Sequence, residues 1–483
     1  MTRPTMPNEY PSTLSEHATP PPLNASILEE LTARGVKFDI DSAVRADHGR
    51  DWWPLSLVDV DAGRVPHWPG VVVRAYSTDD VSVVVELASR HLIPLTAQGG
   101  RSGVVGGAVA PDGGIALDLT GLNRVLHVDE RSGTVRVEAG VFGPDLEAHV
   151  GALGWTVGHF PQSFELSTVG GWLACRGAGQ YSNRYGKIED IVRSLRVVLS
   201  NGDVITVGTD APRQAVGPDL VQLFVGSEGV LGVITEATLA MRPSPAVEHR
   251  AAYRFEQFSE GLDACRLILQ RGARPAVLRL YDETESQRNF DVEGCVLIVL
   301  DEGDAVFAAA TMTVVHDECV SAHVLSVDLV EQWRVHRNDV SALAPLWAAG
   351  LVVDTIEVAA SWSALDEIHQ RVATALRGIE GMIVVSTHQS HAYSDGACLY
   401  FTFAGRASGD VSDFYRAAWD QATNEVLSCG GALSHHHGVG RNRARFVTRA
   451  LGSAFPVFEQ IKHVLDPHNV MNTGVLGVGS DPW

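Results

Sequence analysis

Apolar and polar residues along positions 71–95 follow the pattern of a strand, a helix and a second strand. Val71-Val72-Val73 is a β-branched run typical of a strand. Thr78-Asp79-Asp80 is a helix-capping signal, and Val81, Val84, Val85 and Ala88 fall on one helical face. Extended structure resumes at Ile93-Pro94-Leu95. Further strands are predicted over 115–119 and 134–138, and a hairpin over 195–207 that turns on Asn201-Gly202.

The pattern changes on either side of this region. Residues 25–34 have helical spacing, whereas the polar stretch from His48 to Gly70 is predicted to be extended. Pro243-Ser244-Pro245 marks a boundary. Beyond it, predicted strands alternate with predicted helices, which favours an antiparallel sheet with helices on one face. The strands are expected over 296–300, 352–358 and 382–386, and the helices over 261–269 and 364–376.

Length and charge narrow the class of function. At 483 residues the chain is too long for one hydrophobic core, which stops growing near roughly 250–300 residues, so we expect two domains. The formal net charge of −21 would repel nucleic-acid phosphates and anionic lipid. No apolar run approaches the roughly 18 residues of a membrane helix. We therefore expect a small-molecule substrate, no nucleic acid and no membrane span.

The cysteines and the N-terminal residues favour a cytoplasmic location. The six cysteines are scattered without a Cys-x-x-Cys pair, which argues against a disulfide framework or a zinc ribbon and favours free thiols in a reducing compartment. Residues 1–19 lack the basic and then apolar pattern of a signal peptide. We expect them to form a disordered leader that ends at Pro20-Pro21-Pro22.

Three segments rich in glycine and hydroxyl residues are candidates for ligand binding: residues 96–107, 161–179 and 226–235. Glycines let backbone N–H groups converge on an anion, which suits a diphosphate. A simple turn between strands remains an alternative for the first segment, which is not a Gly-x-Gly-x-x-Gly fingerprint. Each ordered glycine costs roughly 0.5–1 kcal/mol of backbone entropy, so three such segments are hard to explain as turns alone.

Motifs in these segments resemble the FAD-binding fold of the vanillyl-alcohol oxidase and p-cresol methylhydroxylase superfamily. They are QGGRSG at 98–103, STVGGW at 167–172, GSEGVLG at 226–232 and DPHNVMNTG at 466–474. Within that superfamily, GACLYF at 396–401 and SHHHGVG at 434–440 resemble the alkyldihydroxyacetonephosphate synthases.

This resemblance implies an α+β fold in four segments. A leader and helical segment would cover residues 1–66, and a two-part FAD-binding domain of the PCMH type would cover residues 67–243. A substrate or cap domain over 244–425 would be built on an antiparallel sheet covered by helices. A C-terminal segment over 426–483 would carry the histidines and close on the flavin.

The resemblance also implies FAD as the cofactor, with residues 96–102 around its diphosphate. Non-covalent binding is expected, because the first glycine loop contains no histidine to which the flavin could be attached, and His91 lies upstream of it. The residues implied in cofactor binding are Thr96, Ala97, Gln98, Gly99, Gly100, Arg101, Ser102, Gly103, Gln162, Ser163, Ser167, Thr168, Gly171, Cys175, Arg176, Ala178, Glu228, Gly229, Gly232 and Ile234.

Catalytic groups are implied around the flavin ring and the substrate. Tyr400 corresponds to the acid/base tyrosine of the synthases, and a neighbouring cation would have to lower its pKa. On a strand, His435 and His437 would share one side and His436 the other. A hydrogen-bonded loop is the alternative for these histidines. The two remaining candidates are His159, which could instead be a core residue, and Arg279, which could instead form a surface salt bridge.

Two departures from related families bear on the metal and the substrate. Hydroxy-acid dehydrogenases carry a histidine metal motif where this chain retains His391 but has Tyr400 near the second histidine position, so we expect no metal. The synthases place an arginine for the substrate phosphate where this chain has Leu343. Arg334 and Arg337 could replace it only if the local alignment shifts. A neutral or carboxylate substrate is therefore favoured over a phosphate.

The sequence as a whole favours an FAD-dependent oxidoreductase. It would oxidise a carbon that bears OH, in an alcohol or a 2-hydroxy acid, by hydride transfer to flavin N5. The alternative is the synthase reaction, which exchanges an acyl for an alkyl chain through a flavin N5 adduct without net redox. A flavin-binding protein without catalysis is the least favoured class. A homodimer is what the resemblance suggests.

Overall fold

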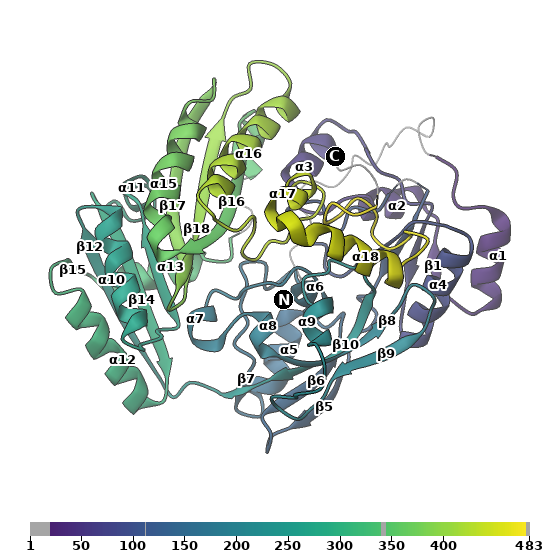
Figure 1. Cartoon of the computed structure of the whole chain (residues 1–483), viewed down its shortest axis with the longest axis horizontal. Coiled ribbons are helices and arrows are strands. Elements are labelled where there is room, and N and C mark those ends of the chain that lie inside the picture. Colours follow the sequence, from purple (N-terminus) through teal and green to yellow (C-terminus); the bar gives the residue numbers. More distant parts are fainter. Residues whose placement is uncertain (1–19, 112, 340–343, 480–483) are drawn as a thin grey trace.

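The computed structural model describes residues 20–111, 113–339 and 344–479. The leader predicted over 1–19 and the position of Leu343 lie outside these ranges. Four sheets and the helices around them form an α+β fold, in which the first half of the chain and the last seven-stranded sheet lie side by side (Figure 1). Within the described ranges, no helix is both long and apolar enough to cross a bilayer.

The first sheet confirms the predicted strand, helix and strand unit. Its order is β1 (Phe38–Asp39), β2 (Val71–Arg74), β4 (Ile115–Asp118) and β3 (Leu95–Gln98), with β2 and β3 parallel to β4. Helix α4 (Thr78–Arg90) buries the predicted face against the sheet. The helix is capped by the residue before the predicted signal, because the Ser77 hydroxyl accepts the N–H of Asp80 at 3.0 Å.

The second sheet is antiparallel and contains the predicted hairpin. Its order is β5 (Val125–Asp129), β6 (Thr134–Glu138), β10 (Val233–Ala240), β8 (Val192–Val198) and β9 (Val204–Gly208). Gly202 has a φ of +85° in the turn between β8 and β9, a conformation that glycine adopts without strain. The short strands β7 (Trp155–Thr156) and β11 (Arg242–Pro243) pair beside it.

The third sheet has seven antiparallel strands and provides one wall of the site described below. Its order is β15 (His323–Leu325), β12 (Val247–Phe255), β14 (Cys295–Gly303), β13 (Val277–Tyr281), β17 (Met382–Ala392), β18 (Gly396–Gly405) and β16 (Val352–Ser361). Helices α10 (Phe258–Gln270), α12 (Ala305–Glu318), α15 (Trp362–Arg377) and α16 (Val411–Ser428) cover its outer face (Figure 1). The predicted antiparallel sheet and its cover of helices on one face are thus confirmed, but the other face is not free of helices.

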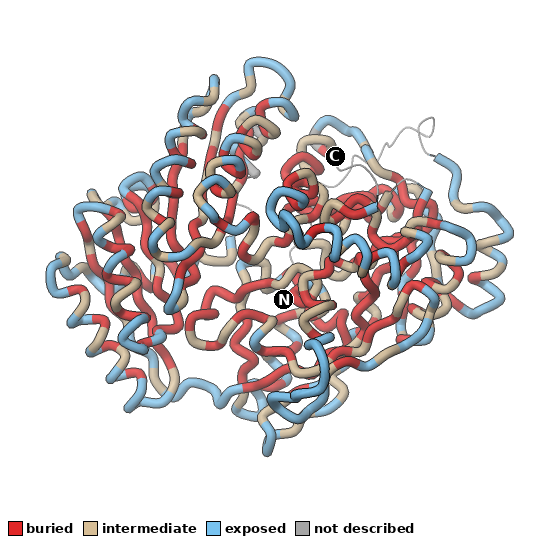
Figure 2. The backbone as a smooth tube through the Cα atoms, viewed as in Figure 1, coloured by how far each residue is buried: buried red, intermediate tan, exposed pale blue. Residues whose placement is uncertain are grey.

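Strand β14 shows how the third sheet joins the first half of the chain. Leu297 and Val299 pack into the core under the outer helices, whereas Ile298 and Leu300 pack with Tyr181 of the first half. Helix α13 (Asp328–His336) lies on this inner side. Both faces of the strand are buried, and Figure 2 shows buried backbone running through the sheets, with exposed segments concentrated at the periphery.

The segment from His48 to Gly70 is not extended as predicted. Helix α3 (Pro54–Asp61) begins inside it, with Pro54 at a first-turn position where no backbone N–H is needed. Trp53 and Leu55 are buried in the core of the third sheet, and the Trp53 indole donates to the Tyr415 hydroxyl at 3.1 Å. This long-range packing, which the local polar pattern does not reveal, fixes the helix.

The other helices are short or lie near the ends of the chain. The last two pack on the first half of the chain, where Phe446, Val447 and Phe455 join the core of the second sheet. The remaining helices are α1 (Ala25–Ala33), α2 (Ser42–His48), α5 (Gly143–Gly151), α6 (Val169–Ala174), α7 (Ser182–Tyr185), α8 (Ile188–Ile191), α9 (Leu220–Phe224), α11 (Glu283–Phe290), α14 (Ala344–Ala348), α17 (Val447–Leu451) and α18 (Phe455–Leu465).

Candidate active site

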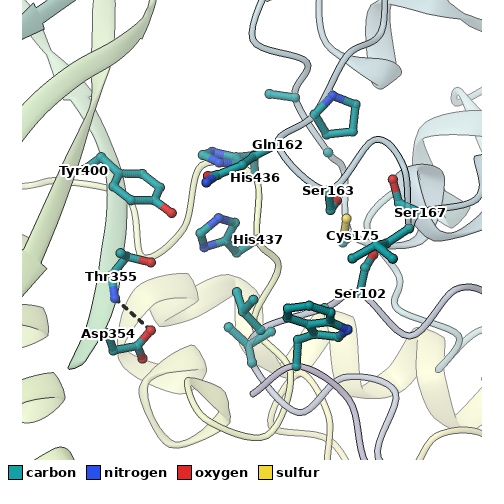
Figure 3. A pocket seen from close by; sticks show the side chains of 18 of the residues that line it. Ser102, Gln162, Ser163, Ser167, Cys175, Asp354, Thr355, Tyr400, His436 and His437 are labelled. Atoms are coloured by element: carbon teal, nitrogen blue, oxygen red, sulfur yellow. Dashed lines mark hydrogen bonds between the residues drawn. The ribbon is translucent and has the colours of Figure 1, made fainter. Parts of the chain in front are cut away.

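A cavity of about 1170 Å³ lies between the first half of the chain and the inner face of the third sheet. Figure 3 shows its two walls, with Ser102, Ser163, Ser167 and Cys175 on one side and Tyr400 and Thr355 on the other. His436 and His437 lie between these walls. The cavity therefore brings together groups from both halves of the chain.

The three glycine-rich segments meet on the first wall. The first follows β3, the second leads into α6 and the third leads into β10, so each joins regular elements that hold its ends. The predicted cofactor residues that line the cavity are Ala97, Gly99, Gly100, Arg101, Ser102, Gly103, Gln162, Ser163, Ser167, Thr168, Gly171, Cys175, Ala178, Glu228, Gly229, Gly232 and Ile234.

Glycines on this wall serve two purposes. An added Cβ on Gly99 would lie 2.2 Å from Thr168 Oγ1, and one on Gly100 would lie 1.8 Å from the Leu166 carbonyl oxygen, so the first two segments pack too closely for a side chain. At Gly103 and Gly229, a Cβ would meet no protein atom closer than 3.7 Å. These are ordinary van der Waals distances, and Gly229 is instead favoured by its φ of +79°. The glycine-lined wall fits a flat cofactor with a diphosphate.

Three predicted cofactor residues lie outside the lining of the cavity. Thr96 donates to the Asn472 side chain at 3.2 Å, and Gln98 contacts His48 Nδ1 at 2.6 Å. Arg176 forms an ion pair with Glu189 at 2.7 Å and also donates to backbone carbonyls. These residues support the glycine-rich segments from behind.

The histidine loop, residues 434–440, is irregular backbone and not the strand assumed from the sequence. His436 and His437 both line the cavity, whereas His435 does not. His435 instead contacts the Tyr393 hydroxyl at 2.9 Å and stacks on His391 with ring centroids 4.9 Å apart. The predicted alternation, with His435 and His437 on one side, is therefore wrong.

The carboxylate of Glu357 on β16 explains this shape. It is fully buried and accepts the backbone N–H of His435, that of His437 at 2.9 Å and the Ser434 hydroxyl at 2.8 Å. Arg443 donates to it from the other side at 2.9 Å. Burial alone would raise the pKa of Glu357, but Arg443, His437 and these donors outweigh it and hold the pKa below its ordinary value. An ionised carboxylate thus anchors the loop.

Glu228 fixes the other end of the histidine loop against the first wall. Its carboxylate accepts the backbone N–H of Val439 at 2.6 Å and of Gly440 at 2.8 Å. Burial raises the pKa of Glu228 to about 7. The predicted cofactor residue Glu228 therefore also joins the third glycine-rich segment to the histidines.

Tyr400 on β18 stands at the centre of the second wall. Its ring lies 5.6 Å from that of His437 and stacks on that of His388 at 4.8 Å between centroids. Burial raises the pKa of Tyr400, and Arg279 opposes that shift only weakly. The lowered pKa that the sequence-based hypothesis required is not found, so Tyr400 is a neutral phenol and a hydrogen-bond donor.

His388 and Glu285 form a polar pair that sequence reasoning missed. The Glu285 carboxylate lies 2.8 Å from His388 Nδ1, and the Arg279 guanidinium lies 2.6 Å from His388 Nε2. Because arginine can only donate, Nε2 is the acceptor and Nδ1 carries the proton that it donates to Glu285. The pairing of β17 with β18 places His388 opposite Tyr400, a long-range register that no local sequence pattern reveals.

Electrostatics match this assignment. Burial lowers the pKa of His388, and Arg279 lowers it further, so the imidazole is neutral. Burial would raise the pKa of Glu285, but His388, Arg288 and hydroxyl donors lower it to about 2. The predicted residue Arg279 lines the cavity and is not engaged in a surface salt bridge with any described residue.

His159 occupies the core position that was its alternative. Its ring is fully buried against Trp172 at 4.7 Å, is absent from the cavity lining, and has no hydrogen-bond partner among the described residues. Burial lowers its pKa to about 3. The structure therefore places His159 behind the first wall, apart from the other predicted catalytic groups.

Nitrogen atoms of His391, His435 and His436 lie within 4.8 Å of one another, close enough to share an ion. They already have partners, however, because His391 Nδ1 contacts the Ser182 hydroxyl at 2.7 Å and His435 Nδ1 contacts His436 Nδ1 at 3.0 Å. The expectation of no metal stays a prediction.

Comparison with known proteins identifies the family. The FAD binding domain family matches residues 69–208, and the C-terminal domain family of FAD linked oxidases matches residues 244–476. An uncharacterized FAD-linked oxidoreductase of Escherichia coli K12, YgcU, is 30% identical over 433 residues, which cover 84% of this chain and 89% of the relative. The chain belongs to the FAD-linked oxidase family. It is an FAD-dependent flavoenzyme, as the resemblance implied.

Other proteins similar to this FAD-linked oxidase include a synthase, a dehydrogenase and a hydroxylase. A solved alkyldihydroxyacetonephosphate synthase is 27% identical, with a TM-score of 0.80 over 94% of this chain and 87% of the other. D-lactate dehydrogenase of Anaerostipes hadrus is 25% identical over 84% of this chain and 89% of the relative. The structure of p-cresol methylhydroxylase, 15% identical, shares the fold with a TM-score of 0.73 over 95% and 98% of the two chains. The predicted superfamily and fold class are confirmed.

Proposed function

We propose that this FAD-linked oxidase oxidises an alcohol or a 2-hydroxy acid at the carbon that bears the OH group. One observation carries the proposal: a single cavity has the glycine-rich FAD segments on one wall and Tyr400, Arg279, His436 and His437 on or beside the other. A substrate held between the two walls seen in Figure 3 would have the cofactor on one side and proton-transferring groups on the other.

The first wall would hold FAD through the backbone of the three glycine-rich segments, with Ser102, Ser163 and Thr168 as hydroxyl neighbours. When bound, the flavin accepts a hydride from a carbon whose hydroxyl proton is removed at the same time. The chain's own residues supply the place for that proton and the orientation of the substrate.

His437 is the group that we assign as the acceptor of this proton. Burial lowers its pKa to about 4, so the imidazole is neutral and can take a proton. Its Nδ1 has no hydrogen-bond partner and lies 3.6 Å from the Glu357 carboxylate, which would stabilise an imidazolium. Tyr400, as a neutral phenol, would donate a hydrogen bond to the same substrate oxygen and orient it.

Arg279 would bind a carboxylate next to the reacting carbon. Its Nη2 is held by His388, while its Nε is buried without a partner, so the guanidinium has donors left for a ligand. A relative named D-lactate dehydrogenase supports a 2-hydroxy acid as the substrate class. Hydride and proton would then leave the same CH–OH unit and give a 2-oxo acid.

The synthase reaction is the second candidate. It is favoured by the likeness to the solved alkyldihydroxyacetonephosphate synthase, which extends over 94% of this chain. It needs a phosphate-bearing acyl ketone and a fatty alcohol, and the flavin would end the cycle oxidised. The two candidates therefore differ in whether a substrate alone bleaches the flavin.

The deciding experiment mixes the oxidised holoenzyme anaerobically with a panel of alcohols and 2-hydroxy acids. Loss of the flavin's visible absorption with one compound supports the oxidoreductase. A flavin that stays oxidised throughout, combined with an ether product from an acyl ketone phosphate and a fatty alcohol, would replace it with the synthase.

A further inference from the structure

A second guanidinium, that of Arg337, lines the same cavity. Arg337 directly follows α13, and its guanidinium carbon lies 4.9 Å from the ring centroid of Tyr181, 5.7 Å from that of Trp333 and 6.0 Å from that of Phe160. These rings come from both halves of the chain. Cation–π attraction to these rings holds the guanidinium without using its N–H donors.

Those donors lack the partners that a protein usually provides. Nη1 of Arg337 is buried and has no hydrogen-bond partner, and no carboxylate of the described residues lies within 4.0 Å of the guanidinium. Neighbouring arginines differ: Arg334 pairs with Glu331 at 2.9 Å, and Arg288 pairs with Glu285 at 3.1 Å. A partly buried cation without a counter-ion is costly unless a ligand provides one.

Arg279 approaches the same indole. Its guanidinium carbon lies 5.9 Å from the Trp333 ring centroid, and its Nε is likewise buried without a partner. Through His388, Arg279 is next to Tyr400, whereas no described contact joins Arg337 to Tyr400 or His388. Trp333 thus contacts both guanidinium groups, of which only that of Arg279 is connected to Tyr400 by a described contact.

We propose that Arg337 binds an anionic group of the substrate, a carboxylate or a phosphate, remote from the carbon that is oxidised. The position of the reacting carbon rests on the proposed function, whereas the anion site rests on the surroundings of Arg337 alone. Arg337 is then a specificity residue, and the substrate is an alcohol or hydroxy acid with a second, distant negative charge. Its fork of donors suits either oxyanion.

The test measures anion binding to the oxidised holoenzyme by calorimetry. Succinate and inorganic phosphate are titrated separately, since neither bears the CH–OH unit to be oxidised. We expect Arg337→Gln to weaken binding of one of them about tenfold or more. Arg334→Gln removes a similar charge three residues away, outside the cavity, and is expected to leave the affinity unchanged.

The possible results distinguish a carboxylate from a phosphate and show whether Arg337 binds an anion at all. If Arg337→Gln loses succinate binding, the anion is a carboxylate. If it loses phosphate binding, the anion is a phosphate. Equal affinities for wild type and Arg337→Gln, or no binding of either anion to the wild type, overturn the proposal. If Arg337→Gln does not fold, Arg337→Lys keeps the charge and loses the fork, and an unchanged affinity in that variant then counts against the proposal.

The readout is independent of turnover. If no alcohol or hydroxy acid reduces the flavin but anion binding still depends on Arg337, the proposed oxidation is wrong and the anion site is supported. Flavin reduction with unchanged anion binding in Arg337→Gln would do the reverse. With a reducing substrate in hand, Arg337→Gln is also expected to raise KM far more than it lowers kcat, because the residue contacts a part of the substrate that does not react.

Discussion

At the scale of single residues, burial decides what each ionisable group can do. Tyr400 and His437 are neighbours, yet burial raises the pKa of the phenol and lowers that of the imidazole to about 4. Both groups are neutral at pH 7, so one can donate a hydrogen bond and the other can accept a proton. The motif GACLYF identifies Tyr400, but only the buried surroundings of this residue show that it is a hydrogen-bond donor.

His437→Ala is expected to slow anaerobic reduction of the flavin by the best substrate about 10²- to 10⁴-fold, the usual contribution of a positioned base. In the wild type the rate should be constant from about pH 5 to pH 8 and fall as the pH drops through about 4, where the imidazole becomes protonated. Stopped-flow absorbance checks both. A rate in His437→Ala equal to that of the wild type would move the base elsewhere.

Glu285→Gln is expected to destabilise the protein by about 3–5 kcal/mol at pH 7, because it removes the charged acceptor of a buried network. The folded-state pKa of Glu285, about 2, lies below its ordinary value of 4.5, so its stabilisation is complete above pH 4.5 and is lost as the pH falls toward 2. Urea unfolding at several pH values measures the free energy of unfolding of the wild type and of Glu285→Gln, whose difference should shrink as the pH falls. The exposed residue Glu283 provides the matched control, Glu283→Gln.

At the scale of elements, the histidine loop shows how a buried charge can replace regular structure. Residues 434–440 belong to no helix or strand, yet two carboxylates on other segments, Glu357 and Glu228, accept most of their N–H groups. Strand β16 therefore shapes the loop. The sequence motif predicted functional histidines, but the assumption of a strand wrongly placed His435 and His437 on the same side.

Glu357→Gln is expected to cost about 3–5 kcal/mol in the free energy of unfolding, since it leaves Arg443 buried without its counter-charge. The loop should also lose its shape, so that flavin reduction slows in protein that is still folded. Denaturant unfolding and stopped-flow reduction measure the two effects. Glu367→Gln, which removes an exposed ion pair with Arg371, is the control and is expected to change stability by less than about 1 kcal/mol.

At the scale of the whole molecule, the site exists because two halves of the chain close on one cavity. The C-terminal segment returns to the first half, where Phe446, Val447 and Phe455 enter the core of the second sheet. Asn472 donates to the backbone oxygens of Gly107 and Glu228 and so ties two glycine-rich segments together. No single segment would bind the cofactor alone.

FAD is expected to be bound without a covalent bond. The first glycine-rich segment contains no histidine, and burial raises the pKa of the cavity cysteine Cys175 to about 12, which leaves it an unreactive thiol. Acid precipitation should therefore release all the flavin into the supernatant. Yellow colour retained in the pellet would contradict this expectation.

Elements fixed by neighbouring residues follow from the sequence, whereas elements fixed by distant residues do not. Local patterns were sufficient for α4, for the hairpin turning at Gly202 and for three strands of the third sheet, β14, β16 and β17, because apolar spacing and turn residues act within a few positions. They failed for α3, because Trp53, the residue just before this helix, is held by a hydrogen bond to Tyr415, 362 residues away. Thr96, Gln98 and Arg176 matched motifs, but their side chains support the wall from behind.

The sequence by itself determined the family, the cofactor and those helices and strands whose apolar spacing is regular, because glycine spacing and apolar periodicity are properties of neighbouring residues. Only the tertiary structure decided which side chains face the cavity. It placed His436 and His437 there, removed His159 and His435, and added His388 with Glu285. Strand register and buried charges set those positions, and both depend on residues far apart in the chain.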